Sequence, residues 1–205
     1  MRARFLRLAV AALAATVIIV PACAAEPKGQ WVEPPKELPH LSLRDSVNNL
    51  DFLFGALKAA PDEETAKAIE QRIWVLWMHS PSDTTNLLMS RAQKAVEQKN
   101  LELALKLLDA IVKIKPDYVE AWNRRATIHY MQKDYGRSLA DIRQVLRLEP
   151  RHFGALTGLG LILQDIGDDR QALEVYRRAL EVYPKLERVP DIVKTLTEKV
   201  EGRDI

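Results

Sequence analysis

Cysteine is almost absent from this chain, since Cys23 is the single one among 205 residues. One cysteine cannot form a disulfide within the chain, so no disulfide framework holds the fold. The four histidines are scattered, and no two of them stand four residues apart, as ligands on one helix would. A structural zinc site takes four Cys or His ligands and therefore lacks them here. We expect neither a metal site nor another cofactor.

Sequence signatures of catalysis are missing as well. The chain has no glycine-rich phosphate loop and no nucleophile elbow. Gly158 and Gly160 stand close together, but they lie inside a helical pattern that no strand precedes. The carboxylates fall at expected helix starts and on outer faces, where they solvate the surface and pair with Lys or Arg. The sequence therefore predicts a protein that is not an enzyme and has no catalytic residues.

The excess of positive over negative charge comes from the first residues of the chain. The formal net charge is +2, and loss of residues 1–24, with Arg2, Arg4 and Arg7 and no acid, lowers it to −1. Nucleic-acid binding depends on clustered Lys and Arg, which release counterions from the phosphates. We expect no nucleic-acid partner.

Residues 1–24 have the pattern of a secretory signal peptide. A basic start is followed by a run without charge, from Leu8 to Val20, and then by small residues that suit cleavage after Ala24. As a helix, this run would cover about 20 Å, less than the roughly 30 Å core of a bilayer. The pattern favours removal of the segment over a permanent membrane span, so we expect an exported protein of the periplasm.

Cys23 leaves a second outcome open at the same place. Val20-Pro21-Ala22-Cys23 resembles the lipidation sequence of bacterial lipoproteins, although Pro21 departs from that pattern. Lipidation of Cys23 would anchor the protein to a membrane, whereas cleavage after Ala24 would release it. The membrane is an expected partner in the lipidated case alone.

A fixed period organises most of the remaining chain. Pro116, Pro150 and Pro184 stand at equal intervals, and the units that they close align without gaps over 85–118, 119–152 and 153–186. A constant spacing of this length predicts an α-solenoid of antiparallel helix hairpins, in which each unit buries its apolar face against its neighbours. The fold class is therefore all-α.

Small residues recur at two matched places in each unit, where the two helices of a hairpin would cross. Small side chains let two helix backbones approach closely. Between the two places stands a dipeptide that predicts a turn. Glycine tolerates positive φ, and Asn or Asp caps the helix that follows. The small pairs are Ala92 and Ala104, Ala126 and Ser138, and Gly160 and Ala172, and the dipeptides are Lys99-Asn100, Lys133-Asp134 and Gly167-Asp168.

These residues make the chain resemble the tetratricopeptide-repeat family. The match uses Trp122, Ala126, Tyr135, Ile142 and Pro150 in the middle unit, and Leu156, Leu159, Gly160, Ala172, Tyr176, Ala179 and Pro184 in the last unit. The first unit matches more loosely, through Leu88, Ala92, Ala104, Leu108, Ile111 and Pro116. The resemblance implies a right-handed superhelix whose concave face binds peptides or partner proteins. Together with the export pattern of residues 1–24, it leads us to expect a partner in the cell envelope. It implies a scaffold or adaptor.

The resemblance also implies which side chains line the concave groove, because the first helix of each pair faces it. Those positions are Asn86, Met89, Gln93, Asn123, Arg124, Thr127, Tyr130, Met131, Thr157, Leu161 and Gln164. Their amides can bond a peptide backbone, and methionine adapts to varied apolar groups. Arg124 is the one strong cation among them, so a clamp for a C-terminal carboxylate is not expected. The alternative function is a lipid-anchored structural subunit of an envelope assembly that uses its helical flanks as the interface.

Three flanking segments complete the chain. Residues 25–41 form a proline-rich stretch that indicates an extended linker or a docking motif for a proline-binding groove, and Trp31 within it is expected to pack against the first helix. Residues 42–84 have two helical patterns that predict a degenerate hairpin capping the first unit, with Trp74 and Trp77 buried against it. Residues 187–205 predict a C-terminal capping helix and tail.

The middle unit carries two unusual side chains. Arg125 stands where the family usually has leucine, and we expect it to pair with Asp141 across the hairpin, since an unpaired buried guanidinium is costly. Arg91, at the same place of the first unit, faces Leu107 instead of an acid. His129 replaces the family's usual tyrosine and is expected to be hydrogen-bonded within the hairpin.

Overall fold

The structure is a computed structural model, and it describes residues 31–32 and 50–202. The predicted signal peptide 1–24, the lipidation candidate Cys23 and most of the predicted linker 25–41 lie outside the described residues. The same holds for residues 42–49, where the N-terminal hairpin is expected to begin. In the part of the chain that is described, no helix is both long and apolar enough for a membrane span.

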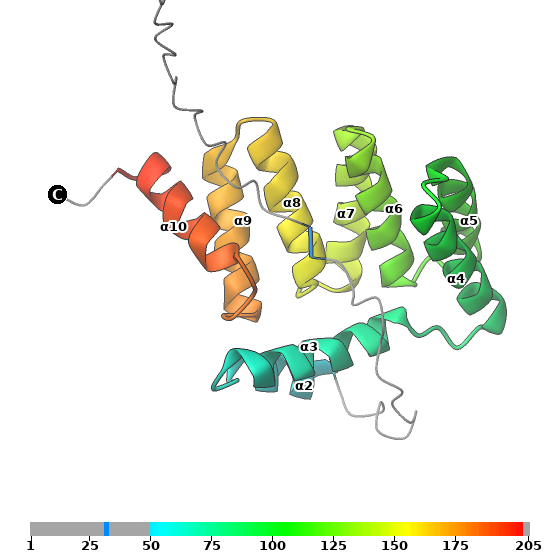
Figure 1. Ribbon diagram of the computed structural model, residues 1–205, viewed down its shortest axis with the longest axis horizontal. Helices are drawn as coiled ribbons and strands as arrows, with labels where there is room; N and C mark the ends of the chain where they lie inside the picture. The colour runs from blue at the N-terminus through cyan, green and yellow to red at the C-terminus, as the bar shows by residue number, and fades with distance from the viewer. Residues whose placement is uncertain (1–30, 33–49, 203–205) are drawn as a thin grey trace, which may run out of the picture.

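Within the described residues the fold is all-α, with nine helices and no strand. Six of these helices form three consecutive antiparallel hairpins that stand side by side in Figure 1, as the predicted solenoid requires. The helices are α2 (Leu50–Lys58), α3 (Glu63–Met78), α4 (Asp83–Glu97), α5 (Leu101–Ile114), α6 (Val119–Met131), α7 (Tyr135–Leu148), α8 (Phe153–Asp165), α9 (Asp169–Val182) and α10 (Val189–Val200). The hairpins are α4–α5, α6–α7 and α8–α9.

The turn inside each hairpin has the same chemistry in all three repeats. The side chains of Asn100, Asp134 and Asp168 each accept a hydrogen bond from the backbone N–H three residues later, at 3.1 Å. The residue before each cap has a positive φ, which is 59° at Lys99 and Lys133 and 85° at Gly167. The turn dipeptides in the sequence therefore do what their residue types predict.

The matched small residues are buried where the two helices of each hairpin meet. Ala92, Ala104, Ala126 and Ala172 are all at most 1% exposed. In the third hairpin a Cβ added to Gly160 would lie 2.6 Å from the ring of Tyr176, so only glycine fits there. These contacts confirm that small side chains set the close approach of the paired helices.

The N-terminal hairpin is placed differently from the prediction. α2 and α3 do not stack as a cap on the first repeat; they share one apolar core with α8, α9 and α10 of the third repeat and the C-terminal helix. In Figure 1, α3 lies across the lower ends of the repeat helices instead of standing beside them. The expectation that Trp74 and Trp77 pack on the first repeat is therefore wrong.

Aromatic side chains explain why α3 docks at the third repeat. Trp77 stacks on the ring of His152, with ring centroids 4.0 Å apart, and Trp74 meets Phe153 edge to face at 5.3 Å. Glu70, which is 2% exposed, accepts hydrogen bonds from Trp74 Nε1 at 3.1 Å and Tyr183 Oη at 3.2 Å. Aromatic rings bury a large apolar area, and those of Trp74 and Trp77 do so on the junction before α8.

The C-terminal helix α10 covers α9, as the sequence predicted. Leu196 is buried and Ile192 and Val200 are half-buried, whereas Lys194 and Glu198 are exposed. Ion pairs of Arg177 with Glu201 and of Lys199 with Asp169, both at 2.8 Å, fix the helix along α9. The apolar face of the last repeat is thereby kept from water.

Replacing Trp74 with alanine should destabilise the fold strongly. Trp74 is the largest fully buried side chain in the described residues, and loss of such a ring typically costs about 3–5 kcal/mol. Urea unfolding followed by circular dichroism would measure this change. Leu87→Ala, at a side chain that is 53% exposed, should change the free energy of unfolding by less than about 0.5 kcal/mol. Equal effects of the two substitutions would show that α3 is not part of the cooperative core.

Candidate functional site

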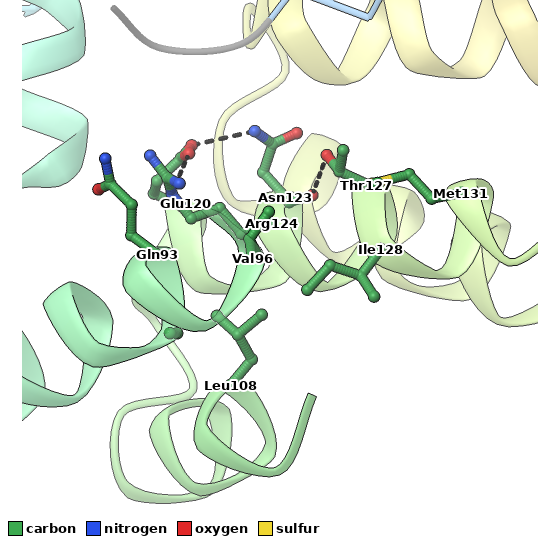
Figure 2. Close-up of a pocket in the computed structure, with 10 residues that line it drawn as sticks. Gln93, Val96, Leu108, Glu120, Asn123, Arg124, Thr127, Ile128 and Met131 are labelled. Carbon is green, nitrogen blue, oxygen red and sulfur yellow. Dashed lines mark hydrogen bonds and ion pairs between the residues drawn. The ribbon is translucent and has the colours of Figure 1, made fainter. Parts of the chain in front are cut away.

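An open pocket lies on the face of the solenoid where α4 and α6 meet. It is lined from α4 by Gln93 and Val96 and from α6 by Asn123, Arg124, Thr127 and Met131, over a floor of Ala92, Leu108, Glu120 and Ile128. Figure 2 shows these side chains gathered along one side of α6. Five of the groove residues predicted from the sequence meet here: Gln93, Asn123, Arg124, Thr127 and Met131.

A buried carboxylate organises the polar end of this pocket. Glu120 is 0% exposed and accepts a hydrogen bond from Asn123 Nδ2 at 3.1 Å. Its Oε1 forms an ion pair with Arg124 Nε at 3.2 Å, whereas Oε2, which accepts from Asn123, lies 3.4 Å from His152 Nε2. His152 Nδ1 accepts from the backbone N–H of Ala155, so Nε2 carries the proton that faces Glu120. The charge of Glu120 is thus balanced by Arg124 and shielded from water.

Asn123 is left with an unused acceptor by this arrangement. Its amide nitrogen must face Glu120, because a carboxylate can only accept, and its Oδ1 therefore points the other way (Figure 2). Asn123 is 1% exposed, and Oδ1 has no hydrogen-bond partner. A buried acceptor without a partner costs about 1–3 kcal/mol. Asn123 is one of the residues that line the open pocket.

Arg124 is not free to bind an anion. Besides its ion pair with Glu120, its Nη2 lies 3.3 Å from Met78 Sδ at the end of α3. The side chain is 20% exposed. Arg124 therefore connects the pocket to the N-terminal hairpin, and an incoming anion would have to compete with Glu120.

The other predicted groove residues lie elsewhere or face inward. Asn86 is bound at both ends of its amide to the backbone of Ser80, and Gln164 accepts a hydrogen bond from Tyr176 Oη at 2.8 Å. Met89, Thr157 and Leu161 are at most 2% exposed. The hydroxyl of Thr157 donates to backbone carbonyls of its own helix. The structure does not place these five side chains at the open pocket.

Trp31 fills the part of the groove between α6 and α8. It is 6% exposed and packs in one cluster with Ala126, Ala155 and Leu161, with its ring centroid 5.6 Å from that of Tyr130. Burial, reinforced by the nearby Asp165, raises the pKa of the Tyr130 hydroxyl to about 12. The expectation that Trp31 packs against the first helix is wrong. Its indole packs on Gly158 of α8, where the lack of a side chain leaves room for the ring.

The predicted pair of Arg125 and Asp141 is confirmed. Arg125 Nε and Nη2 donate to the two oxygens of Asp141 at 2.8 and 2.7 Å, and Nη1 reaches Asp109 at 2.8 Å. The guanidinium also lies over the ring of Trp122, 4.7 Å from its centroid. These contacts raise the pKa of Arg125, chiefly through the hydrogen bonds with Asp141. Arg91 is exposed at the surface.

His129 departs from its prediction. It lies beside Arg125 and Asp141, but its Nδ1 is buried without a hydrogen-bond partner. Burial, which disfavours the charged ring, lowers its pKa. Over the described ranges, no three His, Cys, Asp or Glu side chains gather as a metal site would require.

Comparisons with known proteins agree with this architecture. Two family models, both described as "Tetratricopeptide repeat", match residues 119–152 and 153–186. A TPR repeat-containing protein of Rhizobium etli is 44% identical over 153 residues, which are 75% of this chain and 75% of that protein.

Solved structures show the same fold at low sequence identity. The first TPR of Spaghetti (RPAP3), bound to the HSP90 peptide SRMEEVD, matches with a TM-score of 0.55 and 16% identity over 60% of this chain and 98% of that chain. The TPR domain of Sgt2 from Aspergillus fumigatus matches with a TM-score of 0.54 and 21% identity, over 60% of this chain and 82% of that one. At these identities the likeness concerns the fold alone.

Replacing Arg125 with leucine should destabilise the second repeat. The substitution leaves the carboxylate of Asp141, which is 4% exposed, without its main partner, and breaking such a pair costs about 3–5 kcal/mol. The double variant Arg125→Leu with Asp141→Leu removes both charges and should recover most of that loss. Urea unfolding of the two variants measures the difference. A double variant as unstable as the single one would mean that packing, and not the charge pair, is responsible.

Proposed function

Because the chain belongs to the tetratricopeptide-repeat family, we propose that it is a non-catalytic scaffold that binds an extended segment of a partner protein in the pocket between α4 and α6. Proteins of this fold generally serve protein interaction, and one solved structure of similar fold holds a peptide. The observation that carries the proposal for this chain is the buried, unpartnered Oδ1 of Asn123 beside the open pocket.

The lining of the pocket suits a neutral extended segment. Asn123 Oδ1 would accept from a backbone N–H, and the amide of Gln93 can both donate and accept. Met131, which is 53% exposed, offers a flexible apolar contact at the rim. Among the lining residues Arg124 is the one cation, and it is already paired with Glu120. An acidic C-terminus like that of SRMEEVD would therefore find no free positive charge at this pocket.

The setting of this scaffold is, in our proposal, the cell envelope. The basic and apolar pattern of residues 1–24 supports export, with cleavage after Ala24 giving a periplasmic protein. The resemblance of Val20–Cys23 to a lipidation sequence supports a second candidate, a membrane-anchored subunit of an envelope assembly that binds through its helical flanks.

The mass of the mature N-terminus decides between these two forms. We expect a chain that begins at Ala25 and carries no lipid, as read by intact-mass spectrometry of protein purified from the cells that make it. A diacylated Cys23 at the N-terminus would instead support the membrane-anchored subunit, because it cannot coexist with cleavage after Ala24.

Replacing Met131 with glutamate should weaken partner capture about tenfold or more. The added carboxylate would lose hydration against an apolar partner side chain, and a tenfold loss corresponds to about 1.4 kcal/mol. A photo-crosslinking residue at Gln93 in the full chain, with and without Met131→Glu, gives the yield of crosslinked partner in cells.

Ile114→Glu is the matched control for this experiment. Ile114 is exposed to a similar degree, 59%, but it ends α5 and does not line the pocket. Capture from Gln93 should be unchanged in this variant. Equal losses with Met131→Glu and Ile114→Glu, or no crosslink from Gln93 at all, would overturn the assignment of the pocket.

A further inference from the structure

A short extended segment of this chain already lies in the groove beside the open pocket. Residues 31–32 contact α6 and α8, although they precede α2, the first described helix, in the chain. Figure 1 shows the segment in blue near α8. Tyr130, which borders it, is on the same helix as Asn123 and Thr127, so the segment and the open pocket occupy neighbouring parts of one face.

Two glycines of α8 form the seat of this segment. A Cβ added to Gly158 would lie 2.4 Å from the indole ring of Trp31, and one added to Gly154 would lie 2.8 Å from the carbonyl oxygen of Val32. Four residues apart on a helix, the two glycines share one face. They leave a bare strip of helix, with Gly158 under the indole and Gly154 under the backbone that follows it.

The helix gives up intrinsic stability at Gly158, which lies in its interior, whereas Gly154 is in the first turn of α8, where a Cβ would also lie 3.1 Å from Trp74. Glycine inside a helix costs about 0.5–1 kcal/mol relative to alanine. Gly160 has a structural reason, since it faces Tyr176 in the crossing of α8 and α9. Gly158 meets no other part of the repeat that closely; its neighbour is Trp31. The shape of α8 at Gly158 therefore fits an indole that arrives from outside the repeat.

Trp31 fits this seat in shape but not in hydrogen bonding. Its Nε1 is buried without an acceptor, which costs about 1–3 kcal/mol. A segment that placed the same indole over Gly158 and itself supplied an acceptor for Nε1 would avoid this cost. Such a segment would compete with residues 31–32 for the seat.

We propose that the seat over Gly154 and Gly158 is a second binding site in the groove, for an extended segment of a partner protein that carries a tryptophan. Trp31 closes this site in cis until such a segment displaces it. The inference rests on the proposed function, because it extends the same groove to a second anchor. It names the chemistry of that anchor, an indole followed by an extended backbone.

A peptide of residues 27–36 of this chain, labelled with fluorescein, tests the site in trans. Its binding to the full chain is measured by fluorescence anisotropy for the wild type and for Trp31→Ala. We expect binding to the variant to be at least tenfold tighter, because the affinity of a site is reduced by the fraction of molecules in which it is closed. A peptide in which alanine replaces the tryptophan should not bind the variant.

Gly158→Ala provides the matched control in the Trp31→Ala chain. The new Cβ fills the place of the indole, so peptide binding should be lost. The melting temperature should stay equal or rise, since alanine favours the helix. If Trp31→Ala fails to fold, Gly158→Ala in the otherwise unchanged chain should expel Trp31. The measurement is then increased acrylamide quenching of the Trp31 emission, which is identified by comparison with Trp31→Phe.

Several outcomes would overturn the proposal. Equal peptide binding to wild type and Trp31→Ala, or binding that survives Gly158→Ala, would show that the seat is not a site for a tryptophan. Peptide binding that does not depend on its tryptophan would show the same. A wild-type dimer that Trp31→Ala dissociates would assign the seat to a second copy of this chain. Crosslinking from Gln93 reports on the open pocket separately, so either result can fail without the other.

Discussion

The contact between α3 and the junction before α8 determines where this solenoid is open. Trp77 lies flat on His152, and Trp74 meets Phe153, so the N-terminal hairpin is held across the ends of the repeat helices. Trp74 and Phe153 are fully buried, and rings of this size contribute more to the core than any other residue type. Trp74 of α3 and residues 31–32 lie against Gly154 and Gly158 of α8, whereas the pocket between α4 and α6 stays open. The position of the pocket is thus a consequence of where two tryptophans of α3 are buried.

The repeats themselves could be predicted from the sequence because their determinants are local. A cap such as Asp134, a positive φ at Lys133 and the pairing of Arg125 with Asp141 all lie within one hairpin. Such contacts recur with the period, so each unit supports the interpretation of the next. The placement of α3 could not be predicted in this way. Tyr183 and Glu70 are 113 residues apart, and a single long-range contact of that kind leaves no periodic signal.

The candidate site was predictable in outline and not in detail. Four residues that position in the repeat assigned to the groove, Gln93, Asn123, Thr127 and Met131, line the pocket between α4 and α6. Position in the repeat could not show that Met89 belongs to the core of the first repeat, because the same position is open or covered according to which helix packs above it. Trp31 stands out in the sequence, but the place where it packs depends on Gly154 and Gly158 of α8. These glycines are far from Trp31 in the sequence, so nothing in the sequence pairs them with it.

Glu120 joins these separate features into one unit. Its carboxylate is shared by Asn123 and Arg124 of the pocket and approached by His152, which stacks on Trp77 of α3. Arg124 in turn touches Met78 at the end of α3. A buried polar network of this kind is sensitive to the loss of any member, since each remaining group would be left unpaired in a low dielectric. A ligand that bonds Asn123 Oδ1 therefore acts on a residue whose amide orientation is fixed by Glu120. Through Arg124, which touches Met78, and His152, which stacks on Trp77, the same carboxylate is connected to α3, so the pocket and α3 belong to one packed network.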